Sequence, residues 1–308
     1  SVFDELYENS LAKCEFKNLI SIITAEENIR LAYRNLKKNA GSRTPGTDGK
    51  TIADLAKMSE PELIGFVQQK FNWYQPRSVR RKEIPKGNGK TRPLGIPTIM
   101  DRLIQQCVLQ VMEPICEAKF CETSNGFRPN RGVENALAQA EKHMQKSNLH
   151  IVIDIDIKGF FDNVNHGKLL RQIWTMGIHD KKLLSIISAM LKAEVAGIGF
   201  PEKGTPQGGI LSPLLSNIVL NELDWWITSQ WVGMPTRHEY SGKIHENGTK
   251  DQSKKYRELR KTNLKECYIV RYADDFKIFC RKHSDAVKLF EATRAWLKER
   301  LGLDISPE

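Results

Sequence analysis

Long apolar runs, paired cysteines and a secretory leader are all missing from this sequence. No apolar run approaches the roughly 20 residues that a membrane-spanning helix needs, so membrane insertion is not expected. The first residues, SVFDE, lack the basic stretch and apolar core of a secretion signal. The six cysteines form no CxxC pair and show no regular spacing, which argues against a zinc site or a disulfide framework. We therefore expect a cytoplasmic protein.

Acidic residues are outnumbered by basic ones. The chain holds 47 Lys and Arg against 37 Asp and Glu, which leaves a net charge of +10 in 308 residues. This balance is typical of proteins that bind a polyanion, although charge alone indicates no specific partner. The length exceeds that of one usual compact domain and predicts two or three packed subdomains.

The N-terminal third is predicted to be helical, with basic residues on the polar face. Thr24 and Glu27 have the spacing of a capping box before a helix that reaches about Asn39. Ser59 and Glu62 predict a second capped helix. Turn-forming residues between the two helices predict a basic loop.

Three later segments have distinct patterns. Apolar residues at helical spacing from 102 to 115 predict a core-facing helix, and a further helix is predicted from 133 to 144. Residues 229–266 hold nine Lys and Arg against five acids and few apolar side chains. That composition predicts a polar insertion between core elements.

The most basic segment is 77–92, where seven basic residues face one acid and give a net charge of +6. An Asn-Gly turn at 88–89 lies between short alternating runs, which predicts a β-hairpin. Such a hairpin could close over phosphates. Taken alone, the segment is more simply interpreted as a charged hairpin in solvent. Only the motifs downstream favour a phosphate-binding role over this interpretation.

Two carboxylates are predicted to share one face of a strand. In the run 151–157 the isoleucines alternate with Asp154 and Asp156. The alternative is an edge strand with a solvated polar face, although such faces usually carry charges of both signs. A second run reads as strand, tight turn and strand, with Asp274 and Asp275 at the turn. Adjacent acids at a hairpin tip repel each other unless a cation lies between them.

Oxygen donors of this kind suit Mg²⁺. If Asp156 lies beside Asp274 and Asp275, the three could bind two ions roughly 3.5 to 4 Å apart. A glycine-rich loop at 204–209 lies between the two acidic segments, with Ser212 predicted as the N-cap of the helix that follows. The loop lacks the Lys-Ser/Thr ending of a P-loop and indicates little by itself.

Together these residues resemble the reverse transcriptases, and within them the group II intron-encoded proteins. The matching segments are GTDG at 46–49, RPLGIP at 92–97, GFRP at 126–129, DIKGFFD at 156–162 (motif A), TPQGG at 205–209 (motif B) and YADD at 272–275 (motif C). Their order and spacing match too, and they extend over nearly the whole chain.

The resemblance implies that Asp156, Asp274 and Asp275 bind two catalytic Mg²⁺ ions, with Mn²⁺ as a substitute. It also places Ile157, which follows Asp156, at the metals and the nucleotide. Asp154 is a neighbouring carboxylate to which the resemblance assigns no role.

The resemblance implies a nucleotide-binding set as well. Phe161 matches the aromatic gate that leaves no room for the 2′-hydroxyl of a ribonucleotide. A polymerase that synthesises RNA is expected to have a small or polar residue at this position. Gln207 would contact the incoming nucleotide. Lys86 and Arg92 match positions that hold the triphosphate.

The implied fold is α+β, a right-hand polymerase with a helical N-terminal extension and fingers packed on an antiparallel-sheet palm. The expected parts are an N-terminal extension with a basic helix and loop (1–50), fingers (51–150), the palm strand with motif A (151–170), fingers and palm helices (171–204), and the palm with motifs B and C (205–308), which contains the insertion at about 229–266. The family continues with LGLxISxEK, so the sequence ends inside motif D. The resemblance then implies a fragment without a thumb or maturase domain, whose bare surface could pair two copies.

The implied function is RNA-directed DNA synthesis that copies intron RNA for retrohoming, with binding of intron RNA to assist splicing. The partners would be group II intron RNA, an RNA template with a DNA primer, dNTPs and target DNA, in a bacterial or organellar host, with no membrane. The alternative is an intron RNA-binding maturase fragment without polymerase activity of its own. The residues expected to contact nucleic acid are Arg30, Arg34, Lys37, Lys38, Arg43, Arg77, Arg80, Arg81, Lys82, Lys90 and Arg128.

Overall fold

The computed structural model describes residues 1–308 apart from 86–88, 90, 241, 247, 249 and 307–308. The described residues form a mixture of helices and antiparallel sheet, in two compact units. The first unit comprises 1–120 and 159–219, and the second comprises 121–158 and 220–308. Within the described ranges, none of the helices combines the length and the apolar composition that crossing a membrane requires.

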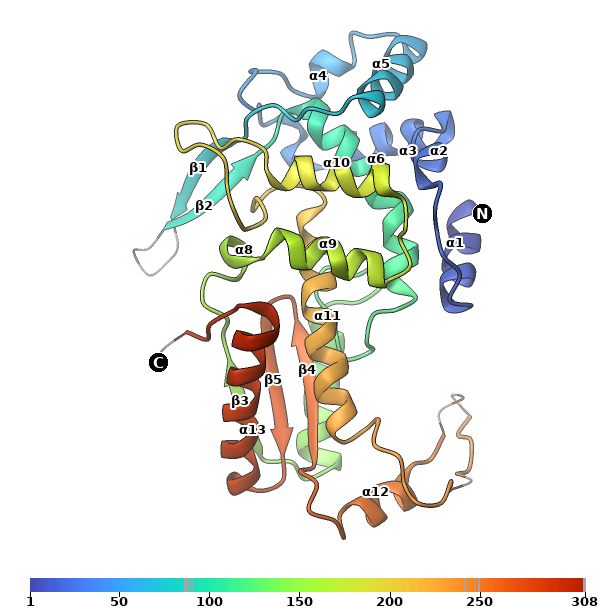
Figure 1. Ribbon diagram of the computed structural model, residues 1–308, viewed down its shortest axis with the longest axis vertical. Helices are drawn as coiled ribbons and strands as arrows, with labels where there is room; N and C mark the ends of the chain where they lie inside the picture. The colour runs from blue at the N-terminus through green and yellow to red at the C-terminus, as the bar shows by residue number, and fades with distance from the viewer. Residues whose placement is uncertain (86–88, 90, 241, 247, 249, 307–308) are drawn as a thin grey trace. The chain divides into compact units, whose positions relative to one another are not determined.

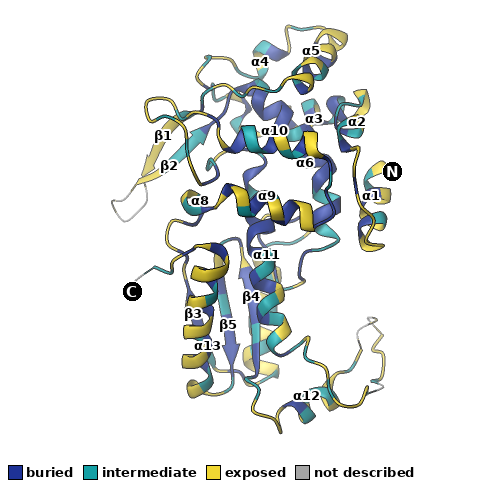
Figure 2. Ribbon diagram, viewed as in Figure 1, coloured by how far each residue is buried: buried dark blue, intermediate teal, exposed yellow. Residues whose placement is uncertain are grey.

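The first unit is built on α6 (Ile99–Glu117), whose apolar side chains are buried. Helices α1 (Val2–Leu11) and α3 (Glu26–Lys38) pack against it, and Figure 2 shows α6 as largely buried. The prediction of a core-facing helix over 102–115 is therefore confirmed. This unit also holds α2 (Leu19–Ile23), α4 (Ile52–Leu55), α5 (Glu60–Asn72), α8 (Phe160–Asn163), α9 (His166–Thr175) and α10 (Lys181–Leu191).

One of the two predicted capping boxes forms. At the start of α5, the backbone N–H of Ser59 donates to the Glu62 carboxylate over 2.8 Å, which confirms that box. The box predicted at Thr24 is wrong. The Thr24 hydroxyl donates to the carbonyl of Ile20 at 2.8 Å because Thr24 ends α2, and α3 begins after Ala25 without a side-chain cap.

The predicted basic hairpin is present in the first unit (Figure 1). Strands β1 (Arg80–Pro85) and β2 (Thr91–Ile96) pair antiparallel, with Arg80 opposite Ile96 and Pro85 opposite Thr91. Two of the residues expected to bind nucleotide or nucleic acid, Lys86 and Lys90, lie outside the described residues.

The second unit contains a three-stranded antiparallel sheet in the order β3-β5-β4, which confirms the antiparallel sheet predicted for the acidic motifs. Its strands are β3 (Ile151–Ile155), β4 (Cys267–Tyr272) and β5 (Asp275–Cys280). Residues paired across strands share a face. Ile153, Ile278 and Ile269 therefore lie on one face, and Asp154 and Lys277 lie on the other.

Helices cover both faces of this sheet. Helix α13 (His283–Trp296) packs on β3 and β5 and lies in front of the sheet in Figure 1. Helix α7 (Val133–Glu141) packs on β4 from the other side, where Ala136 and Ala140 contact the buried Val270 and Phe279. Regular helix gives way at Glu141 to a π-helical turn, so the helix predicted over 133–144 is confirmed with a change in its last residues.

Two more α-helices lie in the part of the chain that the structure describes. Helix α11 (Ser212–Gln230) begins in the first unit and ends in the second. It includes Ser212, which was predicted as its N-cap; the Ser212 hydroxyl instead donates to the carbonyl of Pro206 at 2.8 Å. Helix α12 (Ser253–Leu259) lies in the predicted polar insertion. The insertion is attached to the sheet by Trp231, whose indole N–H donates to the Tyr268 hydroxyl at 3.0 Å.

Candidate functional site

Strand pairing brings the predicted metal-binding acids to one end of the three-stranded sheet. Ile155 of β3 pairs with Phe276 of β5, so the following Asp156 falls opposite Asp275 when the register is continued. Asp274 occupies the turn that joins β4 to β5. Asp156 and the adjacent pair Asp274 and Asp275, which are far apart in the sequence, therefore lie at the same end of the sheet.

The donor chemistry of this sheet end fits Mg²⁺, since carboxylate oxygens are the ligands that the ion prefers. Asp156 and Asp275 are exposed and Asp274 is half-buried, so water and substrate can reach them. Within the part of the chain that the structure describes, no three His, Cys, Asp or Glu side chains converge into a metal site. The Ile157 side chain is buried, so a role at the metals would fall to its backbone.

The last described residues of the chain lie alongside Asp156. The backbone N–H of Ser306 donates to the carbonyl of Asp156, and the Ser306 hydroxyl donates to Oδ2 of the same residue, both at 2.8 Å. On the other side of Ile157, the N–H of Lys158 donates to the carbonyl of Asp304 at 2.8 Å. This segment therefore orients Asp156, a role that the sequence pattern did not indicate for Ser306.

Lys277 contacts two carboxylates on the acidic face of the sheet. Its ammonium lies 2.8 Å from Oδ1 of Asp154 and 3.4 Å from Oδ1 of Asp275. Burial lowers the pKa of Lys277, but the hydrogen bond to Asp154 and the charges of Asp275 and Asp154 together raise it above its ordinary value. Lys277 is therefore a cation at neutral pH, and Asp154 has a partner that the sequence did not predict.

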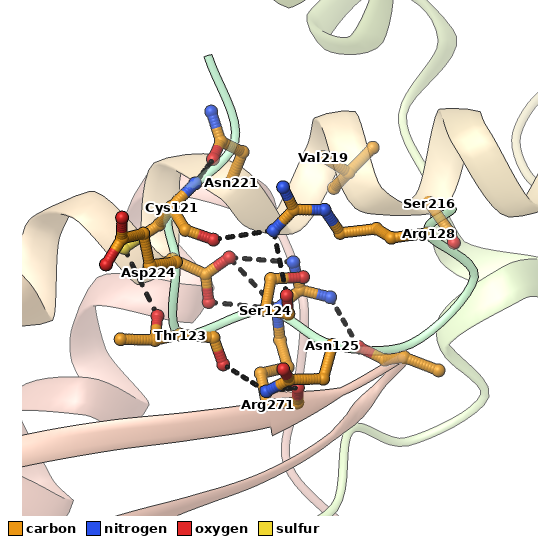
Figure 3. Close-up of polar contacts among 12 residues, drawn as sticks. Cys121, Thr123, Ser124, Asn125, Arg128, Ser216, Val219, Asn221, Asp224 and Arg271 are labelled. Atoms are coloured by element: carbon orange, nitrogen blue, oxygen red, sulfur yellow. Dashed lines mark hydrogen bonds and ion pairs between the residues drawn. The ribbon is translucent and has the colours of Figure 1, made fainter. Parts of the chain in front are cut away.

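A buried ion pair, drawn in Figure 3, contacts the turn that carries Asp274. Arg271 and Asp224 are both fully buried, and their closest nitrogen–oxygen distance is 2.7 Å. Another guanidinium nitrogen of Arg271 donates to the carbonyl of Ala273 at 2.6 Å. Ala273 adopts a φ of +58°, a left-handed conformation that is uncommon for a residue with a side chain. The hydrogen bond from Arg271 stabilises this conformation.

Residues 123–126, which lead into and begin the GFRP segment, support the same turn. Arg271 donates its N–H to the carbonyl of Thr123, and its own carbonyl accepts from the N–H of Asn125, both at 2.9 Å. Immediately after this pairing, a Cβ added at Gly126 would lie 2.2 Å from the backbone nitrogen of Ala273. The absence of a side chain at position 126 therefore lets the two backbones approach.

The structure corrects the nucleic-acid role expected for Arg128. Its side chain is buried, and Nη1 donates to the carbonyls of Cys121 and Ser124, both at 2.8 Å. A guanidinium used in this way holds the 121–128 segment in shape and does not face an RNA phosphate. The sequence could not distinguish this arginine from an exposed one, because burial depends on the tertiary fold.

The nucleotide-binding candidates of the first unit are brought together by backbone contacts. The Phe161 carbonyl accepts from the N–H of Thr205, and the Gln207 carbonyl accepts from the N–H of Gly95, both at 2.7 Å. Arg92 is exposed on β2, the strand that contains Gly95. Parts of motifs A and B and the hairpin are thus neighbours in this unit.

A Cβ at Gly208 would lie 2.5 Å from the Gly95 carbonyl, so this glycine permits the close approach of the loop to β2.

The metal-binding candidates Asp156, Asp274 and Asp275 all belong to the second unit. The nucleotide-binding candidates that the structure describes, except Ile157, belong to the first.

The basic residues predicted to contact nucleic acid differ in their surroundings. Arg30 is paired with Glu60 at 2.7 Å and Glu26 at 2.9 Å, and Arg81 is paired with Glu83 at 2.7 Å. Exposed side chains in this set are Arg34, Lys37, Lys38, Arg43, Arg77, Arg81 and Lys82. Arg80 is partly buried.

We predict that Gly126→Ala lowers the free energy of unfolding by about 1–3 kcal/mol, because the new methyl group overlaps the Ala273 backbone. Gly65→Ala in α5 is the matched control, since a Cβ there meets nothing within 4 Å and should stabilise the helix by about 0.5–1 kcal/mol. Urea denaturation of both variants measures the difference. Equal loss of stability in the two variants would contradict the close-approach explanation.

Asp224→Asn should lower the free energy of unfolding by about 3–5 kcal/mol, because it leaves the Arg271 charge buried without its partner. Replacing both residues, Asp224→Leu with Arg271→Met, should recover much of that loss. Urea denaturation followed by circular dichroism compares the variants. A double variant no more stable than Asp224→Asn would show that the ion pair is not the source of the effect.

Known proteins resemble this chain over most of its length. Residues 84–308 match the family model described as reverse transcriptase (RNA-dependent DNA polymerase). Protein YkfC of Escherichia coli is 34% identical over 86% of this chain and 71% of that protein. Group II intron-encoded protein LtrA of Lactococcus lactis is 34% identical over 99% of this chain and 55% of LtrA.

The putative COX1/OXI3 intron 2 protein of Saccharomyces cerevisiae is 27% identical over 99% of this chain and 38% of that protein. The chain thus spans just over half the length of LtrA and well under half of the yeast protein. With the family model matched across most of its residues, the chain belongs to the reverse transcriptase family of RNA-dependent DNA polymerases, in the group that includes the group II intron-encoded proteins.

Proposed function

We propose that this chain forms the fingers and palm of a right-hand polymerase that synthesises DNA on an RNA template. The observation that carries the proposal is the register of β3, β5 and β4, which brings the positions of Asp156, Asp274 and Asp275 to one sheet end. In this proposal the template is group II intron RNA, copied from a DNA primer with dNTPs during retrohoming into target DNA. Its host is a bacterium or an organelle.

Nucleotidyl transfer in this proposal uses the carboxylates as ligands for divalent metal. Two bound Mg²⁺ ions would lower the pKa of the primer 3′-hydroxyl and offset the charge of the triphosphate. Asp156 would be kept in position by Ser306, and the Asp274 turn by Arg271. Arg92 and Lys86 would contribute positive charge to the triphosphate.

Sugar selection is assigned to Phe161. Its ring meets the buried Phe160 edge-on with centroids 5.3 Å apart, and its carbonyl is held by the N–H of Thr205. These contacts restrict where the half-buried ring can move. A ring fixed beside the sugar would exclude a 2′-hydroxyl by steric overlap.

A second candidate function is binding of intron RNA to assist splicing, without DNA synthesis by this chain. The exposed basic residues that follow and end α3 favour it, since Lys37, Lys38 and Arg43 have exposed side chains. Phosphate contacts by such residues make RNA affinity fall steeply with salt. Specific recognition would appear as resistance to random competitor RNA of equal length.

The test of DNA synthesis is primer extension on poly(rA) with oligo(dT), using the 308-residue chain and its Asp274→Ala variant. We expect extension by the wild-type chain and none by the variant, with Glu291→Ala on α13 as a control that keeps full activity. Primer extension by Asp274→Ala at the wild-type rate would contradict the assignment of Asp274 as a metal ligand. Lack of extension by the wild-type chain, together with selective binding of intron RNA, would establish the second function instead.

For Phe161→Ala we expect the ratio of kcat/KM for dNTP over rNTP to fall by about tenfold or more, because the steric barrier to a 2′-hydroxyl is removed. Single-nucleotide incorporation assays give the ratio. Phe200→Ala is the control, since Phe200 is exposed in the same unit. An unchanged ratio in Phe161→Ala would rule out the gate.

A further inference from the structure

Lys277 and Asp154 form an ion pair immediately beside the candidate metal-binding end of the sheet. They are register partners on β5 and β3, so both side chains lie on the face that carries Asp275. The ammonium of Lys277 is 2.8 Å from Asp154 and 3.4 Å from Asp275. One cation therefore contacts an acid assigned to metal binding and an acid with no assigned role.

The apolar stem of Lys277 borders a pocket. Lys277 helps to line a pocket of about 200 Å³, together with Val270, Phe279 and Ala140 of α7. Its side chain is 41% exposed, which fits a stem that packs in the pocket and a charged end that reaches water. The stem thus runs along the wall of the pocket, and the ammonium at its end contacts the two carboxylates.

A fixed positive charge next to Asp275 opposes the binding of another cation there. Two unit charges 4 Å apart interact by about 1 kcal/mol in water, and a divalent ion doubles this value. At room temperature these energies correspond to about fivefold and about 30-fold changes in a dissociation constant. The contact between Lys277 and Asp275 is thus large enough to set the metal affinity of the site.

We propose that Lys277 weakens the binding of divalent cations at Asp275, and that Asp154 limits this effect by holding the ammonium toward β3. Lys277 and Asp154 are positioning residues in this scheme, and Asp154 is not a metal ligand. The proposal rests on the proposed function, because it takes Asp275 as a ligand. It explains why the acidic face carries a fourth carboxylate.

The test is Mn²⁺ binding to the 308-residue chain without nucleic acid, measured by electron paramagnetic resonance. Lys277→Met keeps the apolar stem and removes the charge, so we expect Mn²⁺ to bind about fivefold to 30-fold more tightly. Lys288→Met is the matched control, since Lys288 is exposed on α13 and its loss should leave the affinity within twofold. Equal affinity of Lys277→Met and the wild-type chain would overturn the proposal.

Asp154→Asn separates the positioning role from direct ligation. We expect this variant to bind Mn²⁺ more weakly than the wild-type chain, because Lys277 is released toward Asp275. In the double variant with Lys277→Met, the Asp154 change should have little effect, since no ammonium remains to be held. A loss of affinity that is the same in both backgrounds would make Asp154 a ligand and overturn its positioning role.

Asp275→Asn distinguishes failure of this proposal from failure of the proposed function. If Asp275→Asn leaves Mn²⁺ binding and primer extension unchanged, the metal assignment itself fails. If Asp275→Asn abolishes binding while Lys277→Met changes nothing, the ion-pair proposal alone fails. Thermal melting checks that each variant is folded, and Lys277→Gln replaces Lys277→Met if the methionine variant does not fold.

Discussion

The buried ion pair between Arg271 and Asp224 is the interaction on which the acidic end of the sheet depends. Two fully buried charges are costly unless they are paired and hydrogen-bonded, and Arg271 meets that condition through Asp224 and the carbonyl of Ala273. The guanidinium thereby joins α11 to the turn that carries Asp274. Loss of Arg271 or Asp224 would remove this connection between the Asp274 turn and α11.

Several family motifs have a structural explanation around that pair. Thr123 and Asn125, just before the GFRP segment, pair with Arg271, and Gly126 lets the two backbones approach at Ala273 without overlap. Arg128 donates to the carbonyls of Cys121 and Ser124, which precede the GFRP segment, and so holds 121–128 in shape. A motif that reads as a basic turn in the sequence is therefore a support for the Asp turn, and its arginine stabilises the protein fold.

Part of the negative charge on the acidic face is offset within the chain itself. Asp154 and Asp275 share the ammonium of Lys277, while Asp156 accepts a hydrogen bond from Ser306. Exposed ion pairs contribute little to the free energy of unfolding. The main effect of Lys277 is therefore the positive charge that it adds beside the carboxylates. The same side chain lines a pocket together with residues of α7.

Local sequence patterns predicted many of the elements of this protein. The spacing of apolar residues predicted α6, the Asn-Gly turn predicted the β1–β2 hairpin, and alternating isoleucines predicted β3, because these signals depend on neighbouring residues. The box expected at Thr24 failed because that hydroxyl already served the preceding helix. The acidic segments, as a strand and a strand-turn-strand, and their order were likewise predicted from the sequence.

Only the tertiary structure decided which distant residues meet. The pairing of Arg271 with Asp224, of Lys277 with Asp154 and of Ser306 with Asp156 joins positions separated by 47, 123 and 150 residues. No local pattern specifies such contacts, since they follow from strand register and from the packing of helices on the sheet. For the same reason, exposed and buried arginines could not be told apart in the sequence, and the role of Arg128 became clear only in the fold.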